Sequence, residues 1–155
     1  QEGFCGTRVE RGPQGLGSGG GGFVGAGCVD EFRDEVRPYL VRVDAQGRPV
    51  WQKAVATSGR CEVYDLQATA DGGLLLTADI TPAADGERFL LVVKADAQGE
   101  VQWQKRLRQP GAVYGGVQSI ETADGAILVL ATRTWGAHQQ HSAASLIQLG
   151  EVDRQ

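Results

Sequence analysis

The sequence predicts an all-β fold made of three propeller-like blades, each a meander of four short antiparallel strands. Two repeated stretches predict it. Residues 39–53 (YLVRVDAQGRPVWQK) recur as residues 91–105 (LVVKADAQGEVQWQK), and residues 69–79 (TADGGLLLTAD) recur as residues 122–132 (TADGAILVLAT). A repeat of about 52 residues, made of short apolar strands and tight turns, is typical of propellers and stacked β-arrays. No stretch shows a helical periodicity, so we expect essentially no helix.

Strands and turns alternate along the chain. The glycine-rich stretch GLGSGGGG is interpreted as a hairpin turn, because neither the Gly-Lys-Ser/Thr of a phosphate-binding loop nor a helical pattern follows it. The turns Asp44 to Gly47 and Asp71 to Gly73 supply Gly where φ must be positive and Asp to bond its own backbone. The expected strands are residues 7–10, 23–28, 39–43, 49–54, 62–69, 74–79, 89–95, 100–107, 114–122, 126–132 and 145–149.

The strands group into one domain of three units, at residues 3–57, 58–110 and 111–155. The third unit ends at GEVDRQ, where the repeat calls for a Trp-Gln-Lys strand, so the last blade is predicted to be incomplete. A β-trefoil is the alternative fold, because it fits the same length and period. Trefoil hairpins do not carry the two recurring motifs, which favours the blades.

The recurring motifs resemble the propeller-type repeats of secreted bacterial proteins, in which D-x-x-G-x-x-x-W-x-K forms the outer hairpin and T-x-D-G-G the inner one. The resemblance covers residues 39–132 and is weak over residues 1–28. Leu66 and Ser119 both stand three places before the T-A-D-G motif, so an apolar residue of one repeat corresponds to a polar residue of the other. This shift of an apolar position predicts a β-bulge there. The resemblance implies binding or scaffolding and supplies no catalytic residue. The matching residues are Asp44, Gly47, Trp51, Lys53, Thr69, Asp71, Gly72, Gly73, Asp96, Gly99, Trp103, Lys105, Thr122, Asp124 and Gly125.

Composition narrows the classes of function. A net charge of −4 and a pI near 5.1 give no basic surface, so nucleic acid is not an expected partner. Apolar runs such as residues 126–131 are far too short to cross a membrane. The chain has no Met, so we expect a processed or cut chain and interpret Gln1 as the residue exposed by removal of a signal peptide. The predicted location is therefore secreted, in the extracellular space.

Three cysteines cannot all pair within one chain. Cys5 precedes the first inner strand and Cys28 ends the strand expected to pair with it, so both fall at one end of one hairpin. We therefore predict a Cys5–Cys28 disulfide, which would stabilise the fold by about 2–4 kcal/mol. Cys61 is predicted to stay a free thiol or to link to another copy.

Candidate sites are sought where the repeats differ, because recurring residues such as Trp51 and Trp103 are expected in packing. The first long connection carries carboxylates whose hard oxygens suit calcium. These carboxylates lack the alternating order of an EF-hand loop, so a solvated acidic loop is the alternative, and no other cofactor is expected. The candidate metal ligands are Asp30, Glu31, Asp34 and Glu35.

The third long connection, residues 133–144, carries the candidate ligand-binding residues Trp135, His138, Gln139 and His141. An indole beside amide side chains suits stacking on a sugar face with hydrogen bonds around it. The His-x-x-His pair also suits zinc, given one more acidic ligand. The alternative is an exposed polar loop that touches a neighbouring subunit.

Three units cannot close a ring, since propellers need roughly four to eight blades. Open sheets leave strand edges that readily pair with another chain, so the sequence predicts self-association of copies into a ring or a filament. The alternative is that the chain is a piece of a longer propeller. No G-x-S-x-G elbow or other catalytic motif is present, which favours a non-enzymatic structural or interaction protein. A carbohydrate-binding module that uses the loop face is the alternative. A metal-dependent enzyme at a channel formed between copies is a third hypothesis.

Overall fold

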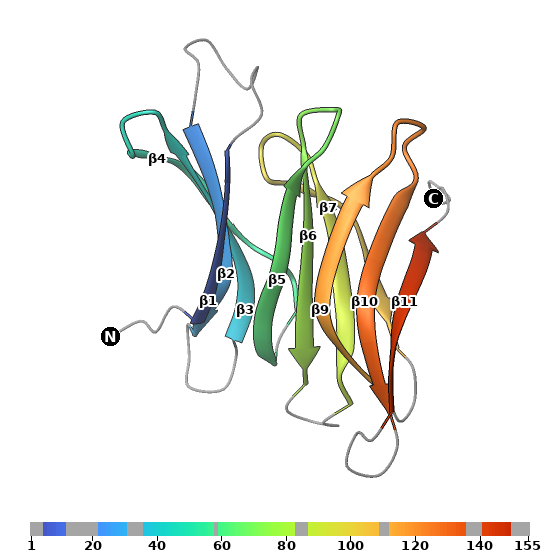
Figure 1. The fold of residues 1–155 in the computed structure, drawn as a ribbon. Helices are drawn as coiled ribbons and strands as arrows, with labels where there is room; N and C mark the ends of the chain where they lie inside the picture. Colours follow the sequence, from blue (N-terminus) through green and yellow to red (C-terminus); the bar gives the residue numbers. More distant parts are fainter. Residues whose placement is uncertain are drawn as a thin grey trace.

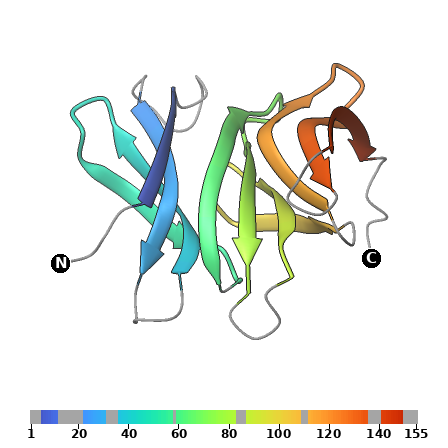
Figure 2. The same ribbon diagram turned by 60° about the horizontal axis from the view of Figure 1, so that its bottom comes forward.

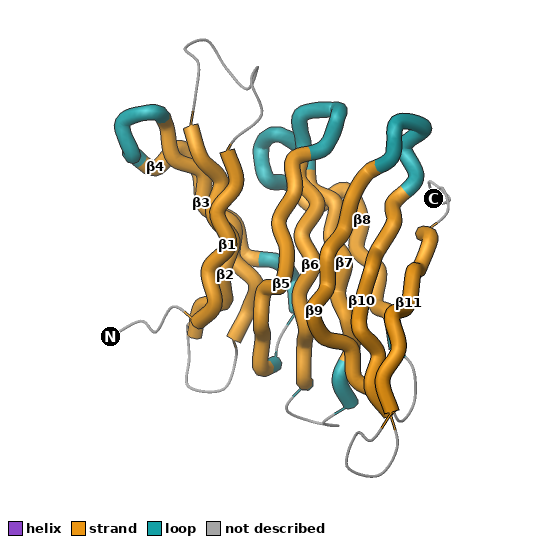
Figure 3. The backbone as a smooth tube through the Cα atoms, in the orientation of Figure 1, coloured by secondary structure: helices purple, strands orange, loops and turns teal. Residues whose placement is uncertain are grey.

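The computed structural model describes residues 5–11, 22–30, 36–57, 59–82, 87–108, 112–135 and 141–149. All regular structure in these ranges is β, and the described part of the chain contains no helix (Figure 3). The expected all-β fold is confirmed. Among these residues there is accordingly no helix that could cross a membrane.

The strands form three antiparallel sheets in which each strand pairs with its neighbour in the chain. Sheet A comprises β1 (Cys5–Arg11), β2 (Gly22–Asp30), β3 (Val36–Asp44) and β4 (Pro49–Ala54). Sheet B comprises β5 (Arg60–Ala68), β6 (Leu74–Thr81), β7 (Phe89–Ala95) and β8 (Val101–Leu107). Sheet C comprises β9 (Ala112–Glu121), β10 (Ile127–Trp135) and β11 (His141–Leu149).

The three sheets stand side by side, with sheet B between the other two (Figures 1 and 2). The first strands of the sheets are neighbours in space, since β1 lies beside β5 and β5 lies beside β9. No sheet closes on itself within the described residues, so these strands do not form the closed barrel of a β-trefoil. The sequence GEVDRQ after β11 lies outside the described residues.

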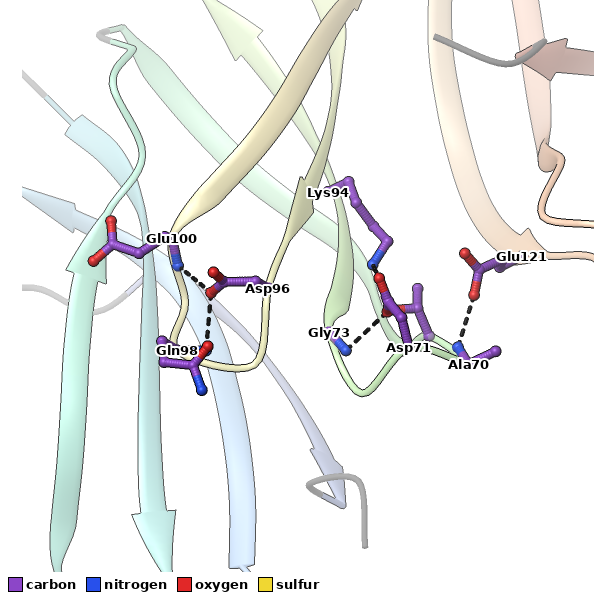
Figure 4. Close-up of polar contacts among 9 residues, drawn as sticks. Ala70, Asp71, Gly73, Lys94, Asp96, Gln98, Glu100 and Glu121 are labelled. Atoms are coloured by element: carbon purple, nitrogen blue, oxygen red, sulfur yellow. Dashed lines mark hydrogen bonds and ion pairs between the residues drawn. The ribbon is translucent and has the colours of Figure 1, made fainter. Parts of the chain in front are cut away.

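The predicted turn chemistry is confirmed. Asp44 Oδ1 accepts hydrogen bonds from the backbone N–H groups of Gln46 and Arg48, both at 2.9 Å, and Gly47 has a φ of 79°. Asp96 repeats the arrangement with Gln98 and Glu100 at 2.9 Å each (Figure 4). Aspartate therefore holds each turn closed while glycine provides the left-handed backbone that the turn needs.

The predicted bulges are present in the first strands of sheets B and C. The β5–β6 register shifts between Val63 and Asp65, and the β9–β10 register shifts opposite the Leu130–Thr132 segment. Each bulge changes the side of the sheet to which the following residues point. Asp65 and Ser119 consequently meet between sheets B and C, as described below.

Two hydrophobic cores hold the sheets together. The first core lies between sheets A and B, where Leu40 and Val24 of sheet A pack with residues such as Leu76 and Val93 of sheet B. The second core lies between sheets B and C and includes Leu75, Val92, Val129 and Ile127. Sheet B is therefore covered on both faces, which explains why β6 and β7 are almost continuously buried.

The recurring tryptophans pack at these cores, as predicted. Trp51 packs against the first core and Trp103 packs against the second. A Cβ added at Gly99 would lie 2.7 Å from the Trp51 ring, so that ring rests directly on the Asp96–Gly99 turn of the next sheet. The Lys53–Glu100 ion pair joins the same two hairpins. The Trp-x-Lys motif thus attaches one repeat to the following one.

The predicted disulfide is wrong. Cys5 and Cys28 do face each other across the β1–β2 ladder, but Cys28 bonds to Cys61 with their Cα atoms 5.8 Å apart. The Cys28 side chain is fully buried in the first core, where it faces sheet B, and Cys61 packs against that core from β5. The prediction considered one hairpin and missed the stacking of sheets. Cys61 is therefore not a free thiol, and no cysteine of the chain is left to pair with Cys5.

The connections that carry the candidate site residues are shorter than predicted. Sheet A extends β2 to Asp30 and begins β3 at Val36, within the predicted connection 29–38. Sheet C extends β10 to Trp135 and begins β11 at His141, within the predicted connection 133–144. The extra ladder pairs satisfy backbone N–H and C=O groups that a loop would leave to water. Trp135 and His141 consequently lie on strands.

Candidate functional site

The predicted calcium ligands are largely outside the described residues. Asp30 ends β2, and only its backbone is described, while Glu31, Asp34 and Glu35 lie beyond the described ranges. Across the described residues, no three His, Cys, Asp or Glu side chains gather closely enough to hold a metal ion.

Two of the four predicted ligand-binding residues come together. Trp135 and His141 are ladder partners at the end of the β10–β11 hairpin, with ring centroids 5.8 Å apart and an angle of 30° between the ring planes. The Arg133 guanidinium lies 4.8 Å from the centre of the Trp135 ring. His138 and Gln139 lie outside the described residues. The half-buried indole is thus already contacted by a cation and an imidazole of its own chain.

A buried polar group lies between sheets B and C. The Ser119 backbone N–H donates to Asp65 Oδ2 at 2.7 Å, and the Thr77 hydroxyl donates to Ser119 Oγ at 2.9 Å. Thr77 and Ser119 are almost completely excluded from solvent, and Asp65 is buried. A serine beside a carboxylate suggests a nucleophile, but these groups are sealed between two sheets and satisfy one another. We assign them a structural role in joining sheet B to sheet C.

The Thr69–Gly73 turn of sheet B is fixed by a buried lysine (Figure 4). Lys94 Nζ donates to both oxygens of Asp71 at 2.7 Å and to Thr69 Oγ1 at 2.8 Å. Partial burial raises the pKa of Asp71, but hydrogen bonds from Lys94, Thr69 and Gly73 outweigh it and lower the pKa to about 2. The adjacent Ala70 N–H donates to Glu121 of sheet C at 2.7 Å. This cluster is a structural clamp at the end of the second core.

A second ionic cluster lies at the opposite end of sheet B. The buried Asp79 carboxylate pairs with Arg88, and the Tyr64 hydroxyl donates to Asp79 at 3.4 Å. Burial, followed by the charge of Glu62, raises the pKa of Tyr64. The carboxylate is already neutralised by its own guanidinium. The cluster therefore closes the end of the sheet without offering an open ligand position.

The outward face of sheet C exposes several large apolar side chains to solvent. We define it by Ile120, Leu128, Leu130 and Leu146, which point away from the second core and pair across the strands as Ile120–Leu128 and Leu130–Leu146. Leu146 is 67% exposed, Ile120 53% and Leu130 47%, while Leu128 is half-buried. Four adjoining large apolar side chains therefore lie on a face that no described strand or turn covers.

The equivalent face of the preceding sheets is fully covered. Counting from the T-A-D-G turns, Leu128 and Leu130 correspond to Leu75 and Thr77, and the ladder pairs make Leu146 the counterpart of Val92. In sheet B all three counterparts are 0% exposed, because sheet C covers them. The counterparts in sheet A, covered by sheet B, are Val24, Ala26 and Leu40.

The outward face of sheet A has no further sheet beside it in the described part of the chain either. We define it by Phe23, Tyr39, Val41 and Val43, which point away from the first core. Phe23 is 45% exposed and the other three are half-buried. Their counterparts in sheet B, Leu74, Leu91, Val93 and Ala95, are buried under sheet A. Both terminal sheets thus leave free the face that an internal sheet would cover.

The sequence contained a signal for these faces. Residues 126–131 (AILVLA) form an apolar run with no polar alternation, which is the pattern of a strand buried on both faces. In sheet B the corresponding run, LLLTA, has a sheet on each side. In sheet C only one face of this run is covered among the described residues, so Leu128 and Leu130 lie on the other face, where Leu130 is exposed.

Comparison with known proteins adds no relative. No protein-family model, no curated protein and no solved structure matches the chain. The resemblance to propeller-type repeats therefore rests on the motifs alone.

Proposed function

We propose that the chain is a non-enzymatic structural or interaction module that self-assembles through its two terminal sheets. In this proposal the three sheets are propeller-type blades of about 52 residues, the last of them incomplete. An array of three blades is too short to close by itself, since rings need roughly four to eight. Copies of the chain supply the missing neighbours.

The single observation that carries the proposal is the exposure of the outward face of sheet C. Leu130 and Leu146 are 47% and 67% exposed at positions whose counterparts in sheet B are completely buried. Fully burying one leucine side chain is favourable by about 1.5–3 kcal/mol. Covering four neighbouring apolar side chains is therefore a substantial driving force for association.

The strand edges support the same proposal. Within the described residues β11 has no further strand beside it, whereas β3 and β7 are each paired on both sides. An unpaired edge presents backbone N–H and C=O groups that readily pair with another chain. The edge and the outward face adjoin on sheet C, so both lie on the side of the molecule that this proposal assigns to a neighbouring copy.

Secretion is the location that this proposal assumes. A disulfide between Cys28 and Cys61 forms and persists in oxidising compartments, and it is rare in the cytosol. A cross-linked sheet pair suits a structural protein that works outside the cell.

Mass measurement in solution tests the proposal directly. Light scattering over a concentration series should show masses above the 16.4 kDa of one chain, and electron micrographs should show rings or filaments. Leu146→Glu should shift the protein toward the monomer. Val101→Glu is the matched control, because Val101 is 42% exposed on the central sheet and away from both outward faces. A wild-type chain that stays monomeric at millimolar concentration would refute the proposal.

A second candidate function is glycan binding at Trp135. The observation that favours it is the half-buried indole at the end of the β10–β11 hairpin, with His141 beside it. A flat indole that is partly accessible suits stacking on a sugar ring. Binding on a glycan array that is lost in Trp135→Ala and kept in Leu146→Glu would assign this role. If the wild-type chain binds no glycan on the array, this second candidate function is ruled out.

A further inference from the structure

Resting on the proposed self-assembly, we infer that the partner of the sheet C outward face is the sheet A outward face of another copy. Association is then head to tail: Leu128, Leu130 and Leu146 of one copy pack against Phe23 and its neighbours on the next. The inference assigns a specific partner surface to each outward face.

The repeat geometry selects this pairing. Each sheet has two different faces, and in both the A–B contact and the B–C contact one type of face packs against the other type. The first type carries Leu75 and Val92 in sheet B, and the second type carries Leu91 and Val93 on the opposite side of that sheet. The outward face of sheet C corresponds to the face of sheet B with Leu75 and Val92. The outward face of sheet A corresponds to the face of sheet B with Leu91 and Val93.

Pairing the two outward faces therefore repeats a contact that the chain already makes twice. A symmetric contact between two sheet C faces, or between two sheet A faces, would bring together faces of the same kind. Neither internal contact does so. The head-to-tail arrangement is the one with a precedent in the molecule.

Side-chain size on the two faces is partly complementary. On sheet A, Gly25 and Gly27 of β2 stand where sheet B has Leu76 and Ala78, so this strand has lost side-chain volume, while Phe23 and Tyr39 are larger than their counterparts Leu74 and Leu91. On sheet C, Leu130 and Leu146 stand where sheet B has Thr77 and Val92, so these strands have gained side-chain volume. Smaller side chains opposite larger ones preserve close packing.

The sheet C side of this contact is uncharged, and Arg37 lies on the sheet A side, on the same face of β3 as Tyr39. The described residues of the sheet C outward face, which adds Gln118, Thr132 and Gln148 around the leucines, carry no charged side chain. Amide and hydroxyl groups at the rim of an apolar patch are the usual composition of a protein interface.

The contact is heterologous, so it propagates from copy to copy. Such contacts close into a ring when the rotation between copies closes, and they form a filament otherwise. Two copies of three sheets bring six sheets, which lies within the roughly four to eight blades of closed propellers.

A complementation experiment tests the inference. Phe23→Glu blocks the sheet A face and Leu146→Glu blocks the sheet C face. Each variant alone should associate more weakly than the wild type by at least about 10-fold, because each contact would bury a carboxylate. Mixed in equal amounts, the two variants should form a heterodimer, since Phe23→Glu retains an intact sheet C face and Leu146→Glu an intact sheet A face.

Each outcome of the experiment decides a separate point. If the wild type is monomeric, the proposed function fails and the inference fails with it. If the wild type associates and Leu146→Glu disrupts it while Phe23→Glu does not, the contact joins two sheet C faces and the inference alone is overturned. The reverse result, or two monomeric variants that fail to form a heterodimer when mixed, overturns it as well.

The variants are chosen to keep the fold. Phe23 and Leu146 are 45% and 67% exposed, so the introduced charges face water in a single copy. Thermal melting checks this, and Phe23→Ser with Leu146→Ser provides an uncharged pair. Should a glutamate variant unfold, the serine pair must reproduce the same complementation for the inference to stand.

Discussion

The contact between sheets A and B and the contact between sheets B and C use corresponding strands but different chemistry. The A–B contact is apolar and covalently closed, with Leu40 and Val24 in its core and the Cys28–Cys61 disulfide across it. The B–C contact contains an apolar core together with the buried Thr77–Ser119–Asp65 hydrogen bonds.

One pair of corresponding residues shows the difference most clearly. Cys28 pairs with Pro38 in sheet A, and Asp79 pairs with Leu90 in sheet B, at the same place in the repeat. Cys28 is bonded to the next sheet, whereas Asp79 forms an ion pair with Arg88, which immediately precedes β7 of the same sheet. The repeat thus determines the position of a residue between the sheets. The type of residue at that position determines whether a disulfide or an ion pair forms there.

The largest expected effect comes from the covalent part of the A–B contact. Cys61→Ala should lower the free energy of unfolding by about 3–4 kcal/mol, because the bridge closes a loop between residues 33 apart in sequence. Urea denaturation with and without reductant measures it. Cys5→Ala is the control and should leave the bridge intact. Equal losses in both variants would contradict the Cys28–Cys61 assignment.

A smaller effect should separate two turns with nearly the same backbone. Gly47 and Gly99 have φ values of 79° and 78°, so Ala at either site costs about 1–2 kcal/mol for the left-handed conformation. A Cβ at Gly99 would also lie 2.7 Å from the Trp51 ring, whereas nothing lies within 4 Å of one at Gly47.

Gly99→Ala should therefore be less stable than Gly47→Ala by a further 1 kcal/mol or so, because the tryptophan must shift. Thermal or urea unfolding of the two variants gives the difference. Equal destabilisation would mean that the Trp51 ring adapts freely, and the attachment of sheet A to the turn of sheet B would then be loose.

The polar part of the B–C contact is expected to be worth less than the disulfide. Thr77→Val removes one of the two hydrogen bonds of the Ser119 hydroxyl, and Ser119→Ala leaves the buried Thr77 hydroxyl without its acceptor, so each should cost about 1–2 kcal/mol. The double variant should cost less than the sum of the single variants, because both polar groups are then removed. A double-mutant cycle in urea measures the coupling, and simple additivity would show that the two hydroxyls act independently.

The smallest expected effect is a dependence on pH. The folded pKa of Asp71 is about 2, below its ordinary value of 3.8, so ionised Asp71 stabilises the fold fully above about pH 4. This contribution is lost as the pH falls from 3.8 toward 2. Asp71→Asn should therefore differ from the wild type less at about pH 2 than at about pH 6.

Asp124 provides the matched control for that measurement. It occupies the corresponding turn of sheet C, where a hydrogen bond from Thr122 and then backbone N–H groups lower its pKa, and Gln148 replaces Lys94. Asp124→Asn should show a weaker dependence on pH. If the stability difference of Asp124→Asn depended on pH as strongly as that of Asp71→Asn, Lys94 would not be the cause of the lowered pKa of Asp71.

Much of the fold could be predicted from the sequence because its signals are local. Gly47 and Gly99 require a positive φ, Asp44 and Asp96 close their own turns, and the recurring motifs place the strands. The bulge near Asp65 was likewise visible as a shift in spacing. These features depend on residues that are near in sequence.

The disulfide and the candidate interface could not be predicted in the same way, because they depend on how sheets stack. Cys28 has a ladder neighbour in Cys5, but its side chain points toward the next sheet and meets Cys61. Leu130 and Leu146 are adjacent through strand pairing, and their exposure follows from the absence of a covering sheet among the described residues. Trp135 was expected in a loop because its ladder partners were not recognisable from sequence.

The bond between Cys28 and Cys61 also has a mechanical consequence. It fastens sheet A to sheet B, whereas in the described part of the chain sheet C is held to sheet B by packing, hydrogen bonds and one connecting segment. Under load or heat, sheet C should therefore peel away first while the cross-linked pair stays upright. In a fibre or ring of such copies, the contact between sheets B and C should therefore separate before the disulfide-linked pair of sheets A and B.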